Sequence, residues 1–226
     1  LDDRALIDGA LHAHPALKVT LFKAVLTASF AASPAFNPLS VRTDWAKLRQ
    51  GGLDVLLSAV YAPEHEIIRD CIYLRLIRFL MPVTYYKVFR RPYFAVANDM
   101  LDRIEAQVKK AGDGVARMAY SVAELERILA LGPKRPVAVV HAVEGGHTLG
   151  GRLERLDALH QRGVAYLTLA HFYPNEAVNP VFPYPESVQK LGCFPYQGDL
   201  TLGLTRFGEE VVERMIELGM IIDIAH

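Results

Sequence analysis

The stretch RPVAVVHAVEGGHTLGG, Arg135–Gly151, decides the fold. It opens with a continuous apolar run, the pattern of a strand that is buried on both faces of a parallel sheet. The run stops at Glu144, and two glycines follow that allow the backbone to turn sharply beside the carboxylate. A strand end that meets solvent would explain this glutamate. A metal ligand at the mouth of a barrel would also explain it, and the rest of the chain must decide.

Short apolar runs alternate with longer helical patterns along the whole chain. Repeated strand–helix units with short, glycine-marked links indicate an α/β fold with a parallel sheet, and both an open doubly wound sheet and a (β/α) barrel fit. We treat residues 1–226 as a single domain. The predicted strands are 5–12, 53–62, 114–121, 136–144, 164–171 and 220–226, and the predicted helices are 64–80, 99–112, 121–132, 151–163 and 205–219.

Charge and composition exclude several classes of protein. Lys and Arg number 25, as do Asp and Glu, so nothing favours binding to nucleic acid or to an anionic membrane surface. No apolar run is long enough for a membrane span. Two cysteines, Cys71 and Cys193, are too few for a disulfide framework or a paired-cysteine metal motif, which favours a cytoplasmic location. A removed N-terminal segment stays open, because the chain begins at Leu1 without a methionine.

Four of the predicted strands end in residues that can bind a metal ion. Each residue alone is ordinary, but in a barrel the carboxyl ends of all strands meet at one face, so these side chains would converge. Two histidines spaced two apart on the first strand would face the same way and reach one ion. The candidate ligands and site residues, in chain order, are His12, His14, Glu144, His171 and His226.

The types of these residues point to hydrolysis. Imidazole and carboxylate ligands without thiolates suit zinc, and also manganese, cobalt or iron. The carboxylate of Glu144 has two oxygens and could bridge two ions, which together can activate a water for attack on an amide or ester.

The remaining histidines fit such a site less well. We expect His65 and His160 to be exposed on helices. His141 precedes Glu144 by an odd number of residues, so it should face the other side of its strand. His147 lies just past the glycine turn, where packing at the rim of the site is the favoured interpretation.

Residues 137–171, VAVVHAVEGGHTLGGRLERLDALHQRGVAYLTLAH, strongly resemble the dipeptidase family typified by renal membrane dipeptidase, which has many bacterial members. The glutamate followed by Gly-Gly-His, the helix and the YLTL-x-H strand appear in the family's order. Residues 203–226, GLTRFGEEVVERMIELGMIIDIAH, and 47–63, KLRQGGLDVLLSAVYAP, resemble two further family blocks. The resemblance extends from Asp8 to His226 and is weakest between about residues 83 and 113.

This resemblance implies a (β/α)8 barrel of the amidohydrolase type, with two zinc ions and dipeptidase activity carried by a hydroxide between the metals. By motif position, Glu144 would be the bridging and catalytic carboxylate, and His226 would bind the second zinc. His171 would contact the substrate near the tetrahedral intermediate. Tyr61, at the end of its strand, is a further candidate for the substrate pocket, although packing explains it too. Family members are commonly dimers, so a homodimer is possible.

Two departures from the family pattern leave alternatives open. His12 takes the first ligand position, but His14 stands where the family usually has aspartate, which raises the charge of the site. The chain also stops at His226, so we expect the last strands to lie beyond it, with a ligand histidine, a substrate-binding arginine and a catalytic aspartate. The alternatives are a lactonase or deacylase of the amidohydrolase kind and a non-catalytic barrel with a decayed metal site. The proline-rich segment 172–200 would shape the pocket or pack between subunits.

Overall fold

A computed structural model describes residues 44–71, 75, 77–80, 82–180 and 202–226. The chain divides into two compact units, Leu1–Leu53 and Asp54–His226. In the first unit, the described residues contain helix α3, Trp45–Gln50, which Asp44 caps by accepting a hydrogen bond from the backbone N–H of Lys47 at 2.8 Å. The strand predicted at 5–12, together with His12 and His14, lies outside the described residues.

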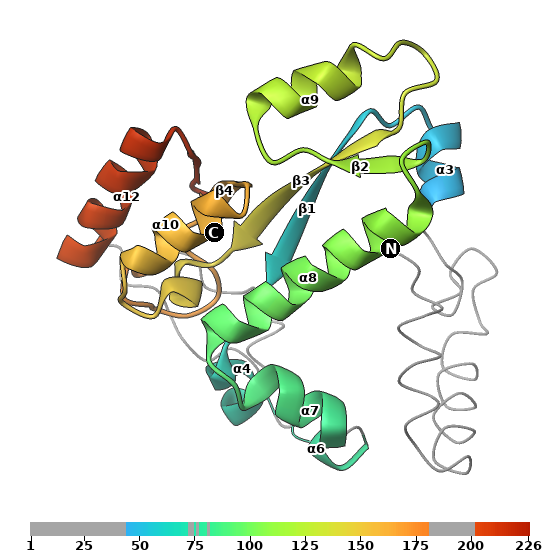
Figure 1. Ribbon diagram of the computed structural model, residues 1–226. Helices are drawn as coiled ribbons and strands as arrows, with labels where there is room; N and C mark the ends of the chain where they lie inside the picture. The colour runs from blue at the N-terminus through green and yellow to red at the C-terminus, as the bar shows by residue number, and fades with distance from the viewer. Residues whose placement is uncertain (1–43, 72–74, 76, 81, 181–201) are drawn as a thin grey trace. The chain divides into compact units, whose positions relative to one another are not determined.

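The second unit is built on a parallel sheet, which confirms the predicted α/β class (Figure 1). Its described strands have the order β1-β3-β4-β5, and β2 pairs with the beginning of β3. Every pairing is parallel. The strands are β1, Val55–Tyr61; β2, Ala116–Met118; β3, Val137–Glu144; β4, Val164–Thr168; and β5, Ile221–Asp223.

Strand β3 is the centre of the sheet. Every residue from Val137 to Val143 is buried, and only Glu144 at the carboxyl end is partly exposed. This burial explains the continuous apolar run in the sequence, because both faces of the strand contact other parts of the chain. At the other end of the strand, the guanidinium of Arg135 pairs with the carboxylate of Asp54 at 2.6 Å and joins the starts of β3 and β1.

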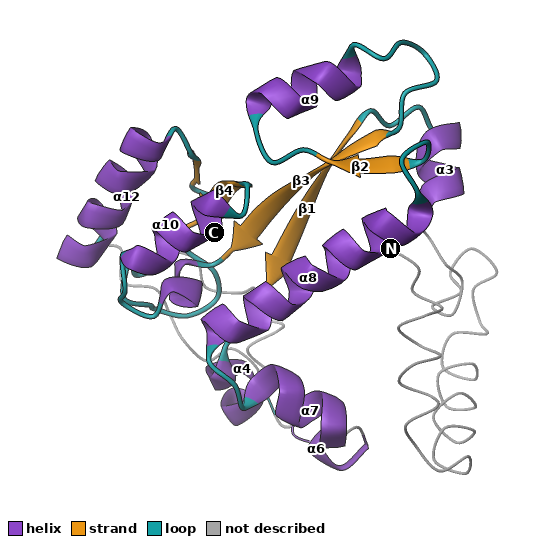
Figure 2. Cartoon of the chain, in the orientation of Figure 1, coloured by secondary structure: helices purple, strands orange, loops and turns teal. Residues whose placement is uncertain are grey.

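The helices follow the sequence pattern with some differences in length. Figure 2 shows α8 running along β1 and β3, which it contacts through a buried apolar stripe that includes Leu101 and Ile104. None of the described helices is both long and apolar enough to cross a bilayer. The described helices of this unit are α4, His65–Asp70; α6, Ile77–Leu80; α7, Pro82–Phe89; α8, Tyr93–Ala111; α9, Val122–Leu129; the 3-10 helix η1, Gly146–Leu149; α10, Glu154–Gln161; and α12, Arg206–Leu218.

The helix predicted over residues 64–80 is wrong as a continuous element. Helix α4 ends at Asp70, and the next residue, Cys71, has an extended backbone.

We expected no disulfide framework from two cysteines, yet Cys71 is disulfide-bonded. Helix α8 begins earlier than predicted because Pro92, which fits the start of a helix, precedes its first turn.

The caps of two helices agree with the sequence. The hydroxyl of Ser121 accepts a hydrogen bond from the N–H of Glu124 at 3.3 Å, and the Glu124 carboxylate reaches back to the N–H of Tyr120. Helix α12 begins after Thr205, whose hydroxyl accepts from the N–H of Gly208 at 3.0 Å. It ends at Leu218 and is capped by Gly219, which has φ of 69°.

Candidate metal centre

The carboxyl ends of four strands are aligned in one row. Tyr61 of β1 pairs with Glu144 of β3, which pairs with Thr168 of β4, and Thr168 pairs with Asp223 of β5. Side chains that end or follow these strands therefore gather at one edge of the sheet, as predicted from the shared direction of the strands. This edge is where ligands bind in parallel α/β folds.

The strand ends themselves need one correction. We predicted that the fifth and last strands reach His171 and His226, but β4 stops at Thr168 and β5 at Asp223. Beyond β5 the N–H of Ala225 turns back to the Asp223 carboxylate at 3.0 Å, so backbone pairing has ended there. Both histidines consequently lie in the segments that follow the strands.

Glu144, His171 and His226 form a compact cluster, and one ligand atom from each lies within 4.8 Å of the other two. The Nε2 atom of His226 is 3.1 Å from Oε1 of Glu144, and Nε2 of His171 is 3.4 Å from the same oxygen. The imidazole rings of the two histidines are 4.6 Å apart between centroids. Three predicted site residues that are distant in the sequence thus meet at one point.

His171 is fixed from several sides. Its side chain is only 4% exposed. The ring of Tyr61 lies against it with the centroids 4.2 Å apart, and the ring of Phe172 lies at 3.7 Å. Tyr61 was predicted as a possible substrate contact, and the structure places it as a neighbour of His171.

Sequence reasoning missed Glu64, which lies between the end of β1 and the start of α4. Its side chain is buried, with a relative exposure of 2%. Its carboxylate contacts Nδ1 of His171 at 3.1 Å and accepts hydrogen bonds from the N–H of Phe172 at 3.0 Å and from the hydroxyl of Tyr61. The only available signal was a second carboxylate just after a strand, as at Glu144.

The charge of Glu64 is stabilised despite its burial. Burial alone would raise the pKa of its carboxyl group. The hydrogen bond from His171, the nearby His147 and the hydroxyl of Tyr61 outweigh that effect and lower the pKa to about 2. Glu64 is therefore an ionised group behind His171.

The two glycines after Glu144 let the backbone pass close to β4. The N–H groups of Gly145 and Gly146 donate to the carbonyls of Thr168 and Leu169, each at 3.0 Å. Gly145 has φ of 100°, and a Cβ on it would lie 2.1 Å from the ring of His147. A side chain at either glycine would thus displace the turn that carries Glu144.

His147 packs beside the cluster and is not one of its members. It is buried, and its Nε2 donates to the carbonyl oxygen of Ala62 at 2.7 Å. Its ring meets that of Tyr93 edge to face, with the centroids 4.8 Å apart. The expected packing at the rim is confirmed, and so is the exposure of His65 and His160 on helices.

His141 faces away from the cluster, as predicted. Its ring is 0% exposed, and Nε2 contacts the carboxylate of Glu105 on α8 at 3.0 Å. Burial lowers the pKa of His141, although Glu105 acts in the opposite direction. Glu105 also pairs with Arg162 at 2.8 Å.

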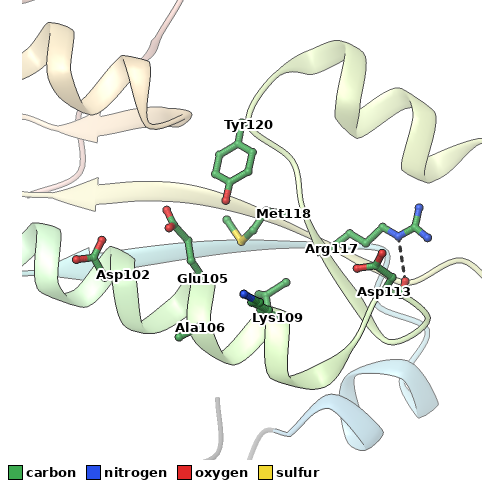
Figure 3. Close-up of a pocket in the computed structure, with 9 residues that line it drawn as sticks. Asp102, Glu105, Ala106, Lys109, Asp113, Arg117, Met118 and Tyr120 are labelled. Atoms are coloured by element: carbon green, nitrogen blue, oxygen red, sulfur yellow. Dashed lines mark hydrogen bonds between the residues drawn. The ribbon is translucent and has the colours of Figure 1, made fainter.

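Glu105 lines a pocket of about 620 Å³ between α8 and the segment around β2. Figure 3 shows the side chains of Glu105 and Tyr120 directed into the space between the helix and this segment. None of the three cluster residues lines this pocket. Two of its acidic residues, Asp102 and Glu105, are paired with Arg162.

The donor set of the cluster suits a divalent cation such as zinc, because it offers imidazole nitrogens and a carboxylate oxygen. Nε2 of His171 lies 3.4 Å from Oε1 of Glu144, so both atoms could contact one cation. The predicted ligands His12 and His14 lie outside the described residues, so their metal-binding role stays a prediction.

Known proteins resemble this chain along much of its length. Dipeptidase 3 of Mus musculus is 37% identical over 117 residues, which cover 50% of this chain and 22% of that protein. Dipeptidase 3 of Homo sapiens is 36% identical with the same coverage. The crystal structure of the dipeptidase AC, a metallopeptidase, superposes with a TM-score of 0.56 at 19% identity and covers 83% of this chain and 48% of that one.

The likeness to the solved dipeptidase supports the fold, and the family assignment rests on the sequence. A profile of the family described as Membrane dipeptidase (Peptidase family M19) matches residues 2–226, nearly the whole chain. The residues that carried the resemblance in the sequence are those that form the cluster in the structure. The chain therefore belongs to the membrane dipeptidase family.

Proposed function

We propose that this chain carries the metal site of a metal-dependent dipeptidase, which hydrolyses the peptide bond of dipeptides. The convergence of Glu144, His171 and His226 at the carboxyl edge of the sheet carries this proposal. The chain spans 22% of the curated dipeptidases it matches and 48% of the solved one, so the activity of the whole protein is inferred. Membership of the dipeptidase family favours this activity over a lactonase or deacylase and over a decayed site.

We infer that the site takes two divalent ions, and the nitrogen and oxygen donors favour zinc. Glu144 and His226 would be ligands, and His12 and His14 would complete the site from the first predicted strand. A bound ion of this kind polarises a carbonyl and makes water a better nucleophile at neutral pH. Glu144 has two carboxylate oxygens, one of which already lies near both histidines.

Neighbouring residues of the chain hold the ring of His171 in one orientation, and Glu64 places a negative charge beside it. The Nε2 atom of His171 faces Glu144, while its other ring nitrogen is held by Glu64. His171 can therefore present one defined nitrogen to a substrate group or an ion at the cluster. Tyr61 covers one face of this ring and restricts its motion. A homodimer remains a prediction from the family resemblance.

The variant Glu144→Gln tests the proposal, because it keeps the volume of the side chain but removes its charge. In the zinc-loaded protein we expect kcat/KM for a set of L-dipeptides to fall by about 10²–10⁴-fold. The matched control is Glu154→Gln, an exposed glutamate on α10 whose partner is Arg152. Full turnover by Glu144→Gln would overturn the proposal, as would a wild-type protein that hydrolyses no dipeptide with zinc bound.

A further inference from the structure

The charges of the whole chain balance, but they are unevenly distributed along it. Residues 71–98 contain five basic side chains and neither Asp nor Glu. Asp99, the first acid after this stretch, is already paired with Arg91, and Arg75 donates to the backbone carbonyl of Arg69 at 3.1 Å. The other three cations are exposed, and within the described residues none of them pairs with a carboxylate: Arg78, Lys87 and Arg90.

Exposed apolar side chains lie among these cations. Phe79 is 64% exposed and Tyr86 is 67% exposed, and Leu80 and Val83 are each about half exposed. A single exposed apolar side chain is ordinary, but these four fall close together on α6 and α7. The guanidinium of Arg78 lies over the ring of Phe79, 4.8 Å from its centroid. We call the exposed side chains between Arg78 and Arg90 the α6–α7 surface.

Helix α7 has an inner and an outer side. Its inner rings, Tyr85 and Phe89, are 5.7 Å apart between centroids and line a pocket of about 340 Å³ together with residues of α4. Helical spacing places Val83, Tyr86 and Lys87 on the outer side, and none of these three lines that pocket. Figure 1 shows α6 and α7 side by side near the N-terminal end of α8, away from the sheet. The outer side therefore projects from the unit.

We propose that the α6–α7 surface binds the anionic surface of a phospholipid bilayer. Basic side chains are attracted to anionic head groups, and several of them close together make the attraction additive. Their apolar stems and neighbouring aromatic rings fit the boundary between head groups and acyl chains. This inference goes beyond the proposed function and does not depend on it, because it needs neither a metal ion nor a peptide bond.

The same observations disfavour a second copy of this chain as the occupant. A symmetric contact through this surface would bring Lys87 and Arg90 of both copies together, and like charges without intervening acids repel each other. A lipid surface supplies the missing negative charge. It is also fluid, so single projecting side chains such as Phe79 and Tyr86 can enter it without a preformed groove.

The first measurement is co-sedimentation of the full chain with vesicles. We expect binding to vesicles of equal parts phosphatidylcholine and phosphatidylserine, and none to phosphatidylcholine alone. A variant with Arg78→Gln, Lys87→Gln and Arg90→Gln should lower the partition coefficient about 5-fold per charge, or about 100-fold in total. Raising NaCl from about 0.1 M to about 1 M should release the wild type, because the screening length falls from about 10 Å to about 3 Å.

The matched control for charge changes three exposed cations of α8: Arg103→Gln, Lys109→Gln and Lys110→Gln. It has the same net charge as the α6–α7 variant and should bind the mixed vesicles about as well as the wild type. An equal loss of binding in the two triple variants would overturn the proposal, since the attraction would then follow net charge alone. A wild type that does not bind the mixed vesicles would overturn it as well.

The second measurement asks whether the apolar side chains enter the bilayer. The chain has a single tryptophan, Trp45, so Trp45→Phe combined with Tyr86→Trp places the only indole on the α6–α7 surface. With mixed vesicles, we expect its emission to shift to shorter wavelength and to be quenched by lipids that carry bromine on their acyl chains. Emission that vesicles leave unchanged would overturn the proposal.

The third measurement uses Phe79→Ala combined with Tyr86→Ala, with the exposed pair Val122→Ala and Ile216→Ala as control. We expect about 10-fold weaker vesicle binding for the first variant only, because buried apolar area is lost. Its unfolding free energy in urea and its mass in sedimentation equilibrium should equal those of the wild type. A marked loss of stability would mean that another part of the chain covers this surface, and a loss of self-association would mean that a second copy does. Either result would overturn the proposal.

Discussion

The Nε2 atom of His226 lies 3.1 Å from Oε1 of Glu144, although the two residues are 82 positions apart in the sequence. The contact joins the ends of β3 and β5, which are separated in the sheet by β4. An imidazole and a carboxylate could pair in this way without a metal. The nearby Nε2 of His171, which approaches the same oxygen, makes a shared cation the better explanation.

Removal of the His226 imidazole should therefore weaken metal binding. For His226→Ala we expect zinc affinity to fall by at least the ~10–100-fold typical of second-sphere changes, because a direct ligand is lost. His226 is partly exposed, so the unfolding free energy of the metal-free protein should change little. Chelator competition and urea unfolding measure the two effects. His160→Ala, on the exposed face of α10, is the control, and equal zinc affinity in both variants would contradict the assignment.

Gly208 on α12 is predicted to tolerate no side chain. A Cβ at this position would lie 1.9 Å from the carbonyl oxygen of Ala177, so the helix or the facing loop would have to move. We expect Gly208→Ala to lower the unfolding free energy by about 1–3 kcal/mol, as overpacking usually does. The control is Gly203→Ala, where a Cβ meets nothing within 4 Å. Urea unfolding that shows equal stability for the two variants would refute the close approach.

His141 should make the stability of the fold depend on pH. Burial lowers the pKa of its folded form below the ordinary value near 6.5, although the facing Glu105 opposes the shift. Below pH 6.5 the unfolded chain then binds a proton that the folded chain resists, so stability is greatest above pH 6.5 and falls with decreasing pH. Asp102, Arg162 and Tyr120 are the other charged or titratable groups near this ring.

The test of this pH dependence uses His141→Gln, which cannot titrate. In metal-free protein, the unfolding free energy of the variant should decline less steeply than that of the wild type between pH 7 and pH 5. His160→Gln on α10 should keep the wild-type slope, because His160 is exposed. Urea unfolding at several pH values gives the slopes, and a wild-type slope in His141→Gln would contradict the prediction.

The sheet and most of the cluster could be predicted from the sequence because their signals are local. The apolar run before Glu144 required burial on both faces, and the alternation with helices required parallel strands. Parallel strands have their carboxyl ends at the same edge of a sheet. The sequence pattern alone therefore predicted that Glu144 and His226 lie at one edge. Strand lengths were overestimated, because the apolar pattern continues at Leu169 and Ile224, which lie beyond the strand ends at Thr168 and Asp223.

Glu64 could not be predicted, because its importance depends on a contact across 107 positions. A single glutamate at the start of a helix is common, since it is favoured by the helix dipole. Its side chain instead turns away from α4 and makes no capping hydrogen bond. Packing around His171 and Tyr61 decides whether the Glu64 side chain bonds to its own helix or to a distant residue. The sequence pattern does not show that packing.

Asp223 at the end of β5 should hold the segment that carries His226. One carboxylate oxygen accepts a hydrogen bond from the hydroxyl of Thr168 at 2.6 Å, and the other accepts from the N–H of Ala225 at 3.0 Å. Asp223→Ala removes both acceptors and leaves the buried hydroxyl of Thr168 without this partner. We expect the unfolding free energy to fall by about 1–3 kcal/mol, the usual cost of an unsatisfied buried polar group.

The same variant should also weaken zinc binding, because the backbone before His226 loses its turn. Thr168→Val separates the two contacts, since it removes the donor on β4 but keeps the bond from Asp223 to Ala225. We therefore expect Thr168→Val to retain most of the zinc affinity that Asp223→Ala loses. Urea unfolding and chelator competition on both variants, with Asp113→Ala as an exposed control, measure these effects. If Thr168→Val loses as much zinc affinity as Asp223→Ala, the pairing of β4 with β5 positions His226, and the turn at Asp223 does not.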